Sequence, residues 1–297
     1  AQTTLEGPFY KGAWILSGRR TYFDLVLPKV LPAETAENIP PYYFYDIQGH
    51  VFSDLSPKDR FSLSYYSGID DIFFDTFGLN GRWGNNTISA HYRRVFNEKL
   101  VGNFLVANSQ FFTSFGLGGD NGLVSYNEID DKTLSADFSW FKSSNSTLKF
   151  GAQLKKLGFE YTNKFQNSTQ FQIKTDPLEF AQYIKLKYKP NDLFIIEPGL
   201  RLNLYDVYLD SLFPDLRLGL KYLLTDDRYI NFSVGNYHQF ISTFQDDFNP
   251  SILDNWIAAD TSVSPGKSMQ VVFGYEEYIK NMYKIQVEGY YKDLKKN

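Results

Sequence analysis

The sequence predicts an all-β protein made of antiparallel strands, and three observations support this class. Apolar and polar side chains alternate with a period of two, because successive side chains of a strand point to opposite faces. Within 193–205 the even-numbered positions, such as Phe194 and Leu200, are apolar, whereas the odd-numbered ones include Arg201 and other polar residues. Such stretches follow one another in pairs joined by turn residues, and no part of the chain has a helical period of convincing length. We therefore expect a single domain over 1–297 that consists of β-hairpins.

The alternation places roughly 13 strands along the chain. In chain order they are 12–27, 42–52, 60–72, 83–96, 100–112, 133–141, 147–159, 180–189, 193–205, 214–224, 229–244, 268–279 and 283–291. The first is an apolar stretch that Arg19 and Arg20 interrupt, and a Pro-containing acidic loop follows it. The short turns are SPKD, NEK, SSNS, PND, TDDR and KNM, several of which carry the Asp, Asn, Ser and Pro residues that suit tight turns. Longer connections alternate with these turns, at 74–82, 116–131, 163–177 and 245–266.

Composition excludes several classes of function. The chain has no Cys, which rules out a disulfide framework and a thiolate metal site. Its net charge of -4 argues against nucleic acid as a partner, because phosphate neutralisation needs a basic surface. No apolar run approaches the length of a membrane-spanning helix. The chain starts without a signal peptide and stops in KDLKKN directly after a strand, so we expect it to be a segment of a longer or processed protein.

Alternation alone does not say whether the apolar face points inward or outward. A soluble sandwich or barrel would bury that face, and it explains the periodicity equally well. A transmembrane β-barrel also explains why short turns alternate with long loops and why aromatic residues make up 18% of the chain. Aromatic residues near predicted strand ends, as expected for girdles at the lipid–water boundary, are Trp14, Phe44, Tyr45, Trp83, Trp140, Phe141, Tyr290 and Tyr291. We therefore favour a partial antiparallel transmembrane barrel, in which Leu200, Leu218 and Phe150 face lipid while Lys149 and Arg201 line a wet interior.

Several motifs, spread over nearly the whole chain, resemble the barrel of TonB-dependent outer-membrane receptors of the Bacteroidetes-like type. They are SGRRTYFDLVL, PYYFYDI, WGN, EPGLRLN, PDLRLGLKY, GNYHQF, SVSPGKSMQVVFGYEEYI and EGYYKDL. One departure is Asp215, where the family pattern has Arg directly after Pro214; Arg217 is the expected substitute on the lumen side. Each motif alone is weak, and their order and spacing carry the resemblance.

The resemblance implies the middle part of a barrel of about 22 strands with a plugged lumen. The family's plug domain, its TonB-contacting segment and its last strands are not among these residues. The implied location is the bacterial cell outer membrane, and the implied partners are outer-membrane lipid, a small-molecule or glycan ligand and, through the plug, the TonB energy-transducing system. No cofactor is implied.

The candidate ligand-binding residues lie in the longest loop and near the expected outer rim. Trp256 is the first candidate, because an exposed aromatic ring beside Asp254 and Asn255 suits stacking on a sugar or chelate, and the alternative is that it packs within its loop or the girdle. The remaining candidates are Asp246, Asp247, Arg19, Arg20 and Trp83. The three histidines lack ligand-like spacing, and the recurring Asp pairs lack the arrangement of a glycosidase. We therefore predict neither a metal site nor an enzyme.

Three functions are compatible with the sequence. The first is an energy-coupled transporter of a scarce nutrient such as an iron chelate, a cobalamin-like cofactor or a glycan. The second is a passive porin or surface adhesin on the same architecture, which needs no plug. The third is a soluble carbohydrate-binding β-protein, which would dissolve without detergent.

Overall fold

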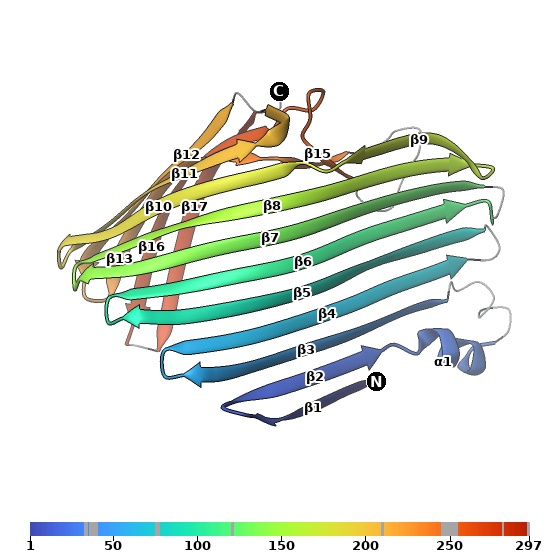
Figure 1. Ribbon diagram of the computed structural model, residues 1–297, viewed down its shortest axis with the longest axis horizontal. Helices are drawn as coiled ribbons and strands as arrows, with labels where there is room; N and C mark the ends of the chain where they lie inside the picture. The colour runs from blue at the N-terminus through green and yellow to red at the C-terminus, as the bar shows by residue number, and fades with distance from the viewer. Residues whose placement is uncertain are drawn as a thin grey trace.

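The protein forms one large, curved antiparallel sheet, as the computed structural model in Figure 1 shows. The structure describes residues 1–32, 35, 41–74, 78–119, 122–208, 211–244, 255–280 and 282–295. Within these residues the main sheet has 15 strands and follows an up-and-down meander, except that β9 pairs only with β8 and that β13 pairs with β16. The strands β13, β16 and β17 lie behind the central strands in Figure 1, so the sheet curls back on itself.

The strands are long relative to those of ordinary globular sheets. Their bounds are β1 Gln2–Phe9, β2 Gly12–Arg20, β3 Tyr42–Ser56, β4 Asp59–Phe74, β5 Leu79–Asn97, β6 Leu100–Leu117, β7 Leu123–Ser143, β8 Ser146–Phe165, β9 Ser168–Thr175, β10 Leu178–Asn191, β11 Phe194–Tyr205, β12 Leu212–Thr225, β13 Arg228–Gln239, β16 Gly266–Ile279 and β17 Tyr283–Lys295. All thirteen predicted strands are present, and several run well beyond the predicted bounds. The extensions carry polar residues on both faces, such as Tyr126–Asp130 in β7, where the two-residue alternation of hydrophobicity no longer marks a strand.

The two ends of the sheet differ in their connections. At one end, β3–β4, β5–β6, β7–β8, β10–β11 and β12–β13 are each joined by two residues. Side chains close these turns: Asn191 Oδ1 accepts hydrogen bonds from the backbone N–H groups of Leu193 and Phe194, both at 3.0 Å. We call this the turn end and the opposite one the loop end. The predicted asymmetry between short turns and longer loops is therefore confirmed.

Four predicted features are wrong in detail. Residues 23–27 do not continue the first strand, because helix α1 spans Phe23–Val30. This short apolar run fits a strand or a helix equally well, and Asp24 in the first turn of the helix pairs with Arg20 at the end of β2 (2.7 Å). Strand β1 lies outside the predicted strands. The connection 163–177 is largely β9, which pairs with β8. The predicted strand 229–244 divides, because β14 (Ile241–Phe244) leaves the main sheet and pairs with β15 (Asn255–Ala258) in a separate two-stranded sheet.

The polar face of the sheet is the concave one. The β14–β15 pair, which we call the inner hairpin, follows β13 in the chain yet contacts β7 and β8. Three strands (β10, β11 and β12) separate β13 from β8 in the sheet, so the hairpin reaches β8 only across the hollow of the curve. There the hairpin contacts Leu157 and Phe159, which lie on the same face of β8 as Lys149, so the face with the charged side chains is the concave one. The opposite, convex face presents exposed apolar side chains, among them Phe150 and Leu216, and Leu200 and Leu218 lie on it too.

This orientation decides between the two interpretations of the alternation. A soluble sandwich would bury Leu200, Leu218 and Phe150 against a second layer. Over the described residues no second layer covers the convex face, and Leu216 there is 61% exposed. The described helices include none that is long and apolar enough to cross a membrane.

Candidate functional site

The inner hairpin is fixed to the concave wall by hydrogen bonds between its backbone and one side chain. Asn127 on β7 is only 1% exposed. Its Oδ1 accepts a hydrogen bond from the backbone N–H of Trp256 at 2.9 Å, and its Nδ2 donates to the Trp256 carbonyl at 3.1 Å. The same Nδ2 lies 3.2 Å from the carbonyl of Glu160 on β8. One amide side chain thus replaces the strand partner that β15 lacks on this side, which satisfies backbone groups that would otherwise be unpaired.

Apolar packing beside this contact holds the Trp256 side chain. Leu157, Phe159 and Ala258 form a buried cluster, against which Trp256 packs with Ile129 and Ile241. The indole is therefore partly buried, and it packs against a cluster formed by Leu157 and Phe159 of the barrel wall and by Ala258 of its own hairpin.

A second, aromatic cluster supports the far side of the hairpin. Tyr205 and Phe240 stack with ring centroids 4.6 Å apart, and Phe213 meets Phe240 edge to face at 5.2 Å. The Tyr205 hydroxyl donates to the carbonyl of Ala259 at 2.9 Å. Because Tyr205 is 1% exposed, this hydrogen bond satisfies a hydroxyl that would be costly to bury alone. The first cluster thus holds Trp256 and Ala258 of β15, and the second holds Ala259, which follows the strand.

On the turn-end side of the hairpin, charged side chains form a connected network across the concave wall. Arg201 on β11 lies 3.3 Å from Glu179 and 3.0 Å from Gln153 Oε1, and its Nε donates to Asn203 Oδ1 at 2.7 Å. Asn203 Nδ2 donates in turn to Asp215 Oδ2 at 3.3 Å. Hydrogen bonds with an ionised partner are stronger than neutral ones, so this network makes a polar and well-connected wall.

Asp215, the residue that departs from the family pattern, is at the centre of this network. It is 2% exposed, and its Oδ1 lies 2.7 Å from His238 Nδ1. Arg217 approaches its Oδ2 to 3.7 Å and stacks over the Tyr237 ring. The expectation that Arg217 lies on the lumen side is consistent with this position on the concave face. Among the described residues, no cluster of three or more His, Asp or Glu side chains is arranged to hold a metal ion.

The loop ends of β2 to β5 carry the remaining described candidates. Arg19 pairs with Asp46 and stacks over the Phe44 ring, whereas Arg20 pairs with Asp24 of α1. Trp83 on β5 is opposite Asp70 on β4, a residue that accepts a hydrogen bond from the Tyr42 hydroxyl at 2.6 Å. The register puts Arg19 and Trp83 on the concave parity and Arg20 on the convex one. Of the candidates, the structure therefore places Arg19 and Trp83 on the concave face near the loop end and Trp256 of β15 against β7 and β8.

The other loop candidates cannot be placed in the same way. Asp246, Asp247 and Asp254 lie outside the described residues, and Asn255 is described only as the first backbone position of β15. Asn127, Tyr205 and Asp215 were not among the residues predicted from the sequence, because their neighbours are far away in the chain. The separation of 129 residues between Asn127 and Trp256 has no local signal.

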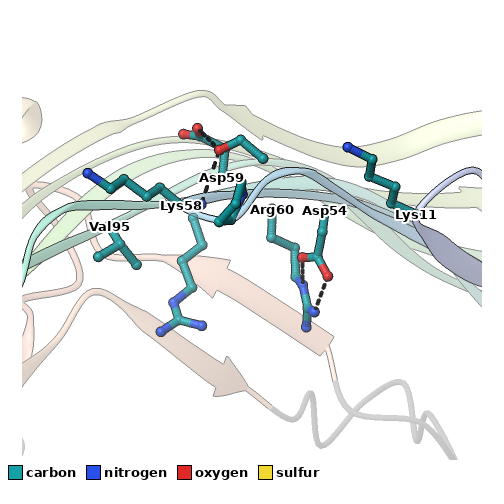
Figure 2. A pocket seen from close by; sticks show the side chains of 9 residues that line it. Lys11, Asp54, Lys58, Asp59, Arg60 and Val95 are labelled. Carbon is teal, nitrogen blue, oxygen red and sulfur yellow. Dashed lines mark hydrogen bonds and ion pairs between the residues drawn. The ribbon is translucent and has the colours of Figure 1, made fainter.

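A charged pocket lies at the turn end, on the concave side of β3 to β5 (Figure 2). It encloses about 430 Å³, and four cationic side chains line it: Lys11, Lys58, Arg60 and Arg93. Arg60 makes two hydrogen bonds to Asp54, at 2.6 and 2.8 Å, which Figure 2 shows as dashed lines. This hydrogen bonding holds the pKa of Asp54 below its ordinary value. The pocket is open and far from the hairpin, so it is a separate feature.

Comparison with known proteins shows the fold. No family model and no curated protein matches the sequence. The structure resembles that of the siderophore receptor PirA from Pseudomonas aeruginosa, with a TM-score of 0.72 and 12% identity over 99% of this chain and 51% of that one. A variant of the ferric enterobactin receptor PfeA from Pseudomonas aeruginosa gives 0.71 and 11%, over 99% and 50%. The copper transporter OprC gives 0.68 and 10%, over 96% and 49%.

The likeness to these two receptors and to this copper transporter confirms the partial antiparallel barrel fold that the resemblance implied. The chain has the architecture of part of their barrel, and it spans about half the length of the solved structures it matches. At 10 to 12% identity the likeness concerns the fold alone.

Proposed function

We propose that this chain forms part of the barrel of an outer-membrane receptor that takes up a scarce nutrient by energy coupling. The observation that carries the proposal is the division of the sheet into an apolar convex face and a charged concave face spanned by an inner hairpin. Only a structure that meets lipid on its outside gains from exposing Leu216 and its neighbours there. The architecture shared with siderophore and copper receptors supports the same conclusion.

The proposed ligand is an iron chelate, a cobalamin-like cofactor or a glycan. Trp256 would present an aromatic edge to it, and Arg201 with its partners would supply charged hydrogen bonds from the wall below. Arg19 and Trp83 would contact it from the rim, together with the loop residues Asp246, Asp247, Asp254 and Asn255, whereas Arg20, on the convex face and paired with Asp24, would not. The barrel itself would be a rigid support, with the ligand-selective residues on loops and on the hairpin.

Energy would come from TonB acting on a plug that belongs to the longer protein. The plug would fill the hollow below the inner hairpin, where the charged network faces the interior. Ligand release would then follow movement of the plug, while the wall stays fixed.

Growth on a limiting nutrient tests the proposal. The gene for the full-length protein would be deleted, and the strain grown on a panel of ferric chelates, cobalamin and glycans as limiting sources. We expect a defect on one source, restored by the intact gene but not in a strain without TonB. Uptake that continues without TonB would instead show a passive porin, and the absence of any uptake defect together with altered cell attachment would show an adhesin. A protein that is found in the soluble fraction would overturn both membrane functions.

A further inference from the structure

A groove on the convex face combines apolar side chains with two lysines. It encloses about 670 Å³ and lies across β4 to β8, with Leu63, Ile88, Val106, Leu134 and Leu154 among its lining residues. Ala90 forms part of its lining, and this small side chain leaves room between the larger ones. Val106 and Leu134 are 58% and 53% exposed, so nothing in the described protein fills the groove.

Two lysines close the groove toward the loop end. Lys132 on β7 and Lys156 on β8 are direct cross-strand partners, on the same face as Leu134 and Leu154. Each lies next to the last apolar side chain that its strand contributes to the groove, so the pair marks the edge of the apolar band there. In a transmembrane barrel this is the level at which acyl chains give way to headgroups.

Like charges directly opposite one another on neighbouring strands are destabilising. On the concave face the equivalent pair, Lys149 and Lys185, has a carboxylate beside it: Glu197 lies 2.6 Å from Lys185. Lys132, by contrast, makes no ion pair within 4 Å among the described residues, although Asp130, two residues away on the same face, attracts it at longer range. Lys156 contacts Asp176 at 3.2 Å, but that carboxylate is 75% exposed. Among the described residues, no carboxylate makes an ion pair with both lysines of the convex pair.

We propose that this groove binds a membrane lipid with an anionic phosphate headgroup. The phosphate would lie between Lys132 and Lys156, and one acyl chain would occupy the groove past Leu134 and Ala90. A phosphate offers several oxygens to two ammonium groups, whereas a single exposed carboxylate such as Asp176 serves only one. Asp130 lies two residues beyond Lys132 on the same face, where it would contact the water side of the headgroup.

The inference rests on the proposed function only in taking the convex face as the lipid-facing one. A protein that transports its nutrient normally but binds no lipid here would overturn the inference and leave the proposed function intact. A protein that fails in uptake but binds lipid in the groove would do the reverse.

Lipid titration of the full-length protein tests the site. The protein would be delipidated in a non-ionic detergent, and phosphatidylglycerol binding would be counted by native mass spectrometry. We expect one tightly retained lipid, and a loss of affinity of about thirtyfold in the double variant Lys132→Gln and Lys156→Gln, because each lysine near an anionic surface contributes about fivefold and the variant removes two. The matched control is Lys149→Gln with Lys185→Gln, which removes the same charge from a cross-strand pair on the concave face and should leave the affinity within about twofold.

Two further arms separate the lipid from a free anion. Ala90→Leu fills the groove without changing charge, and we expect it to weaken lipid binding severalfold. Inorganic phosphate at millimolar concentration should fail to displace the lipid. The proposal is overturned if the convex and concave double variants lose affinity equally, if Ala90→Leu has no effect, or if inorganic phosphate competes as well as the lipid does.

Discussion

Replacing Asn127 with Ala should release the inner hairpin from the wall. The substitution removes two hydrogen bonds to Trp256 and one to the carbonyl of Glu160. Each hydrogen bond contributes about 1 kcal/mol net, so the two that reach the hairpin together stabilise its docked position by about 2 kcal/mol. That free energy corresponds to an increase of about thirtyfold in the population of the undocked hairpin.

Hydrogen exchange measures this population, because local opening sets the exchange rate of protected backbone amides. We expect the amides of 256–259 to exchange about thirtyfold faster in the Asn127→Ala protein, while amides of β7 away from the site keep their protection. Asn127→Asp keeps an acceptor for the Trp256 N–H but places a carboxylate against the Trp256 carbonyl, so it should also raise the exchange rate.

The matched control is Ser135→Ala on the same strand and face. Ser135 is 8% exposed and donates to Asp137, with no contact to the hairpin. It should leave exchange at 256–259 unchanged. Equal rates in the Asn127→Ala and Ser135→Ala proteins would refute the idea that this amide anchors the hairpin.

Four other outcomes follow from the same structure. Leu216→Arg, on the convex face, should reduce folding stability in lipid vesicles by about 2–4 kcal/mol, whereas Ser233→Arg on the concave face should cost much less; tolerance of Leu216→Arg would place that face in water. Tyr205→Phe should speed amide exchange at 258–260 by about fivefold, because the Ala259 carbonyl loses a donor worth about 1 kcal/mol, and unchanged protection there would contradict the role given to the hydroxyl. Residues 1–297 prepared alone should aggregate without detergent, since β1 and β17 each pair on one side only, and a monodisperse soluble species by light scattering would argue for the soluble alternative. The hydrogen bond from Arg60 lowers the pKa of Asp54, so the stabilisation from this pair is present above the ordinary pKa of aspartate and is lost as the pH falls through the lowered value. Arg60→Gln should therefore raise the pKa of Asp54 in an NMR titration, and an unchanged pKa would show that the pair has no such effect.

The sequence by itself determined the strands and their order. Successive residues of a strand belong to opposite faces, so 148–154 and 214–224 could be predicted as strands without any knowledge of the fold. The turns could be predicted in the same way, because the side chains of Asn191 and Ser56 accept hydrogen bonds from backbone N–H groups two or three residues further along the chain. Where the local signal was ambiguous or weak, as at 23–30 and in β9, the prediction was wrong.

Only the tertiary structure decided which face is inside and what lies against it. Alternation is symmetric between a buried and a lipid-facing side, so the direction of curvature had to be seen before Leu216 and Arg201 could be assigned to opposite surroundings. The hairpin anchor at Asn127 depends on a contact between distant parts of the chain, and so does the buried position of Asp215. Such contacts arise from the closing curve of the sheet, which brings together strands that no local pattern relates.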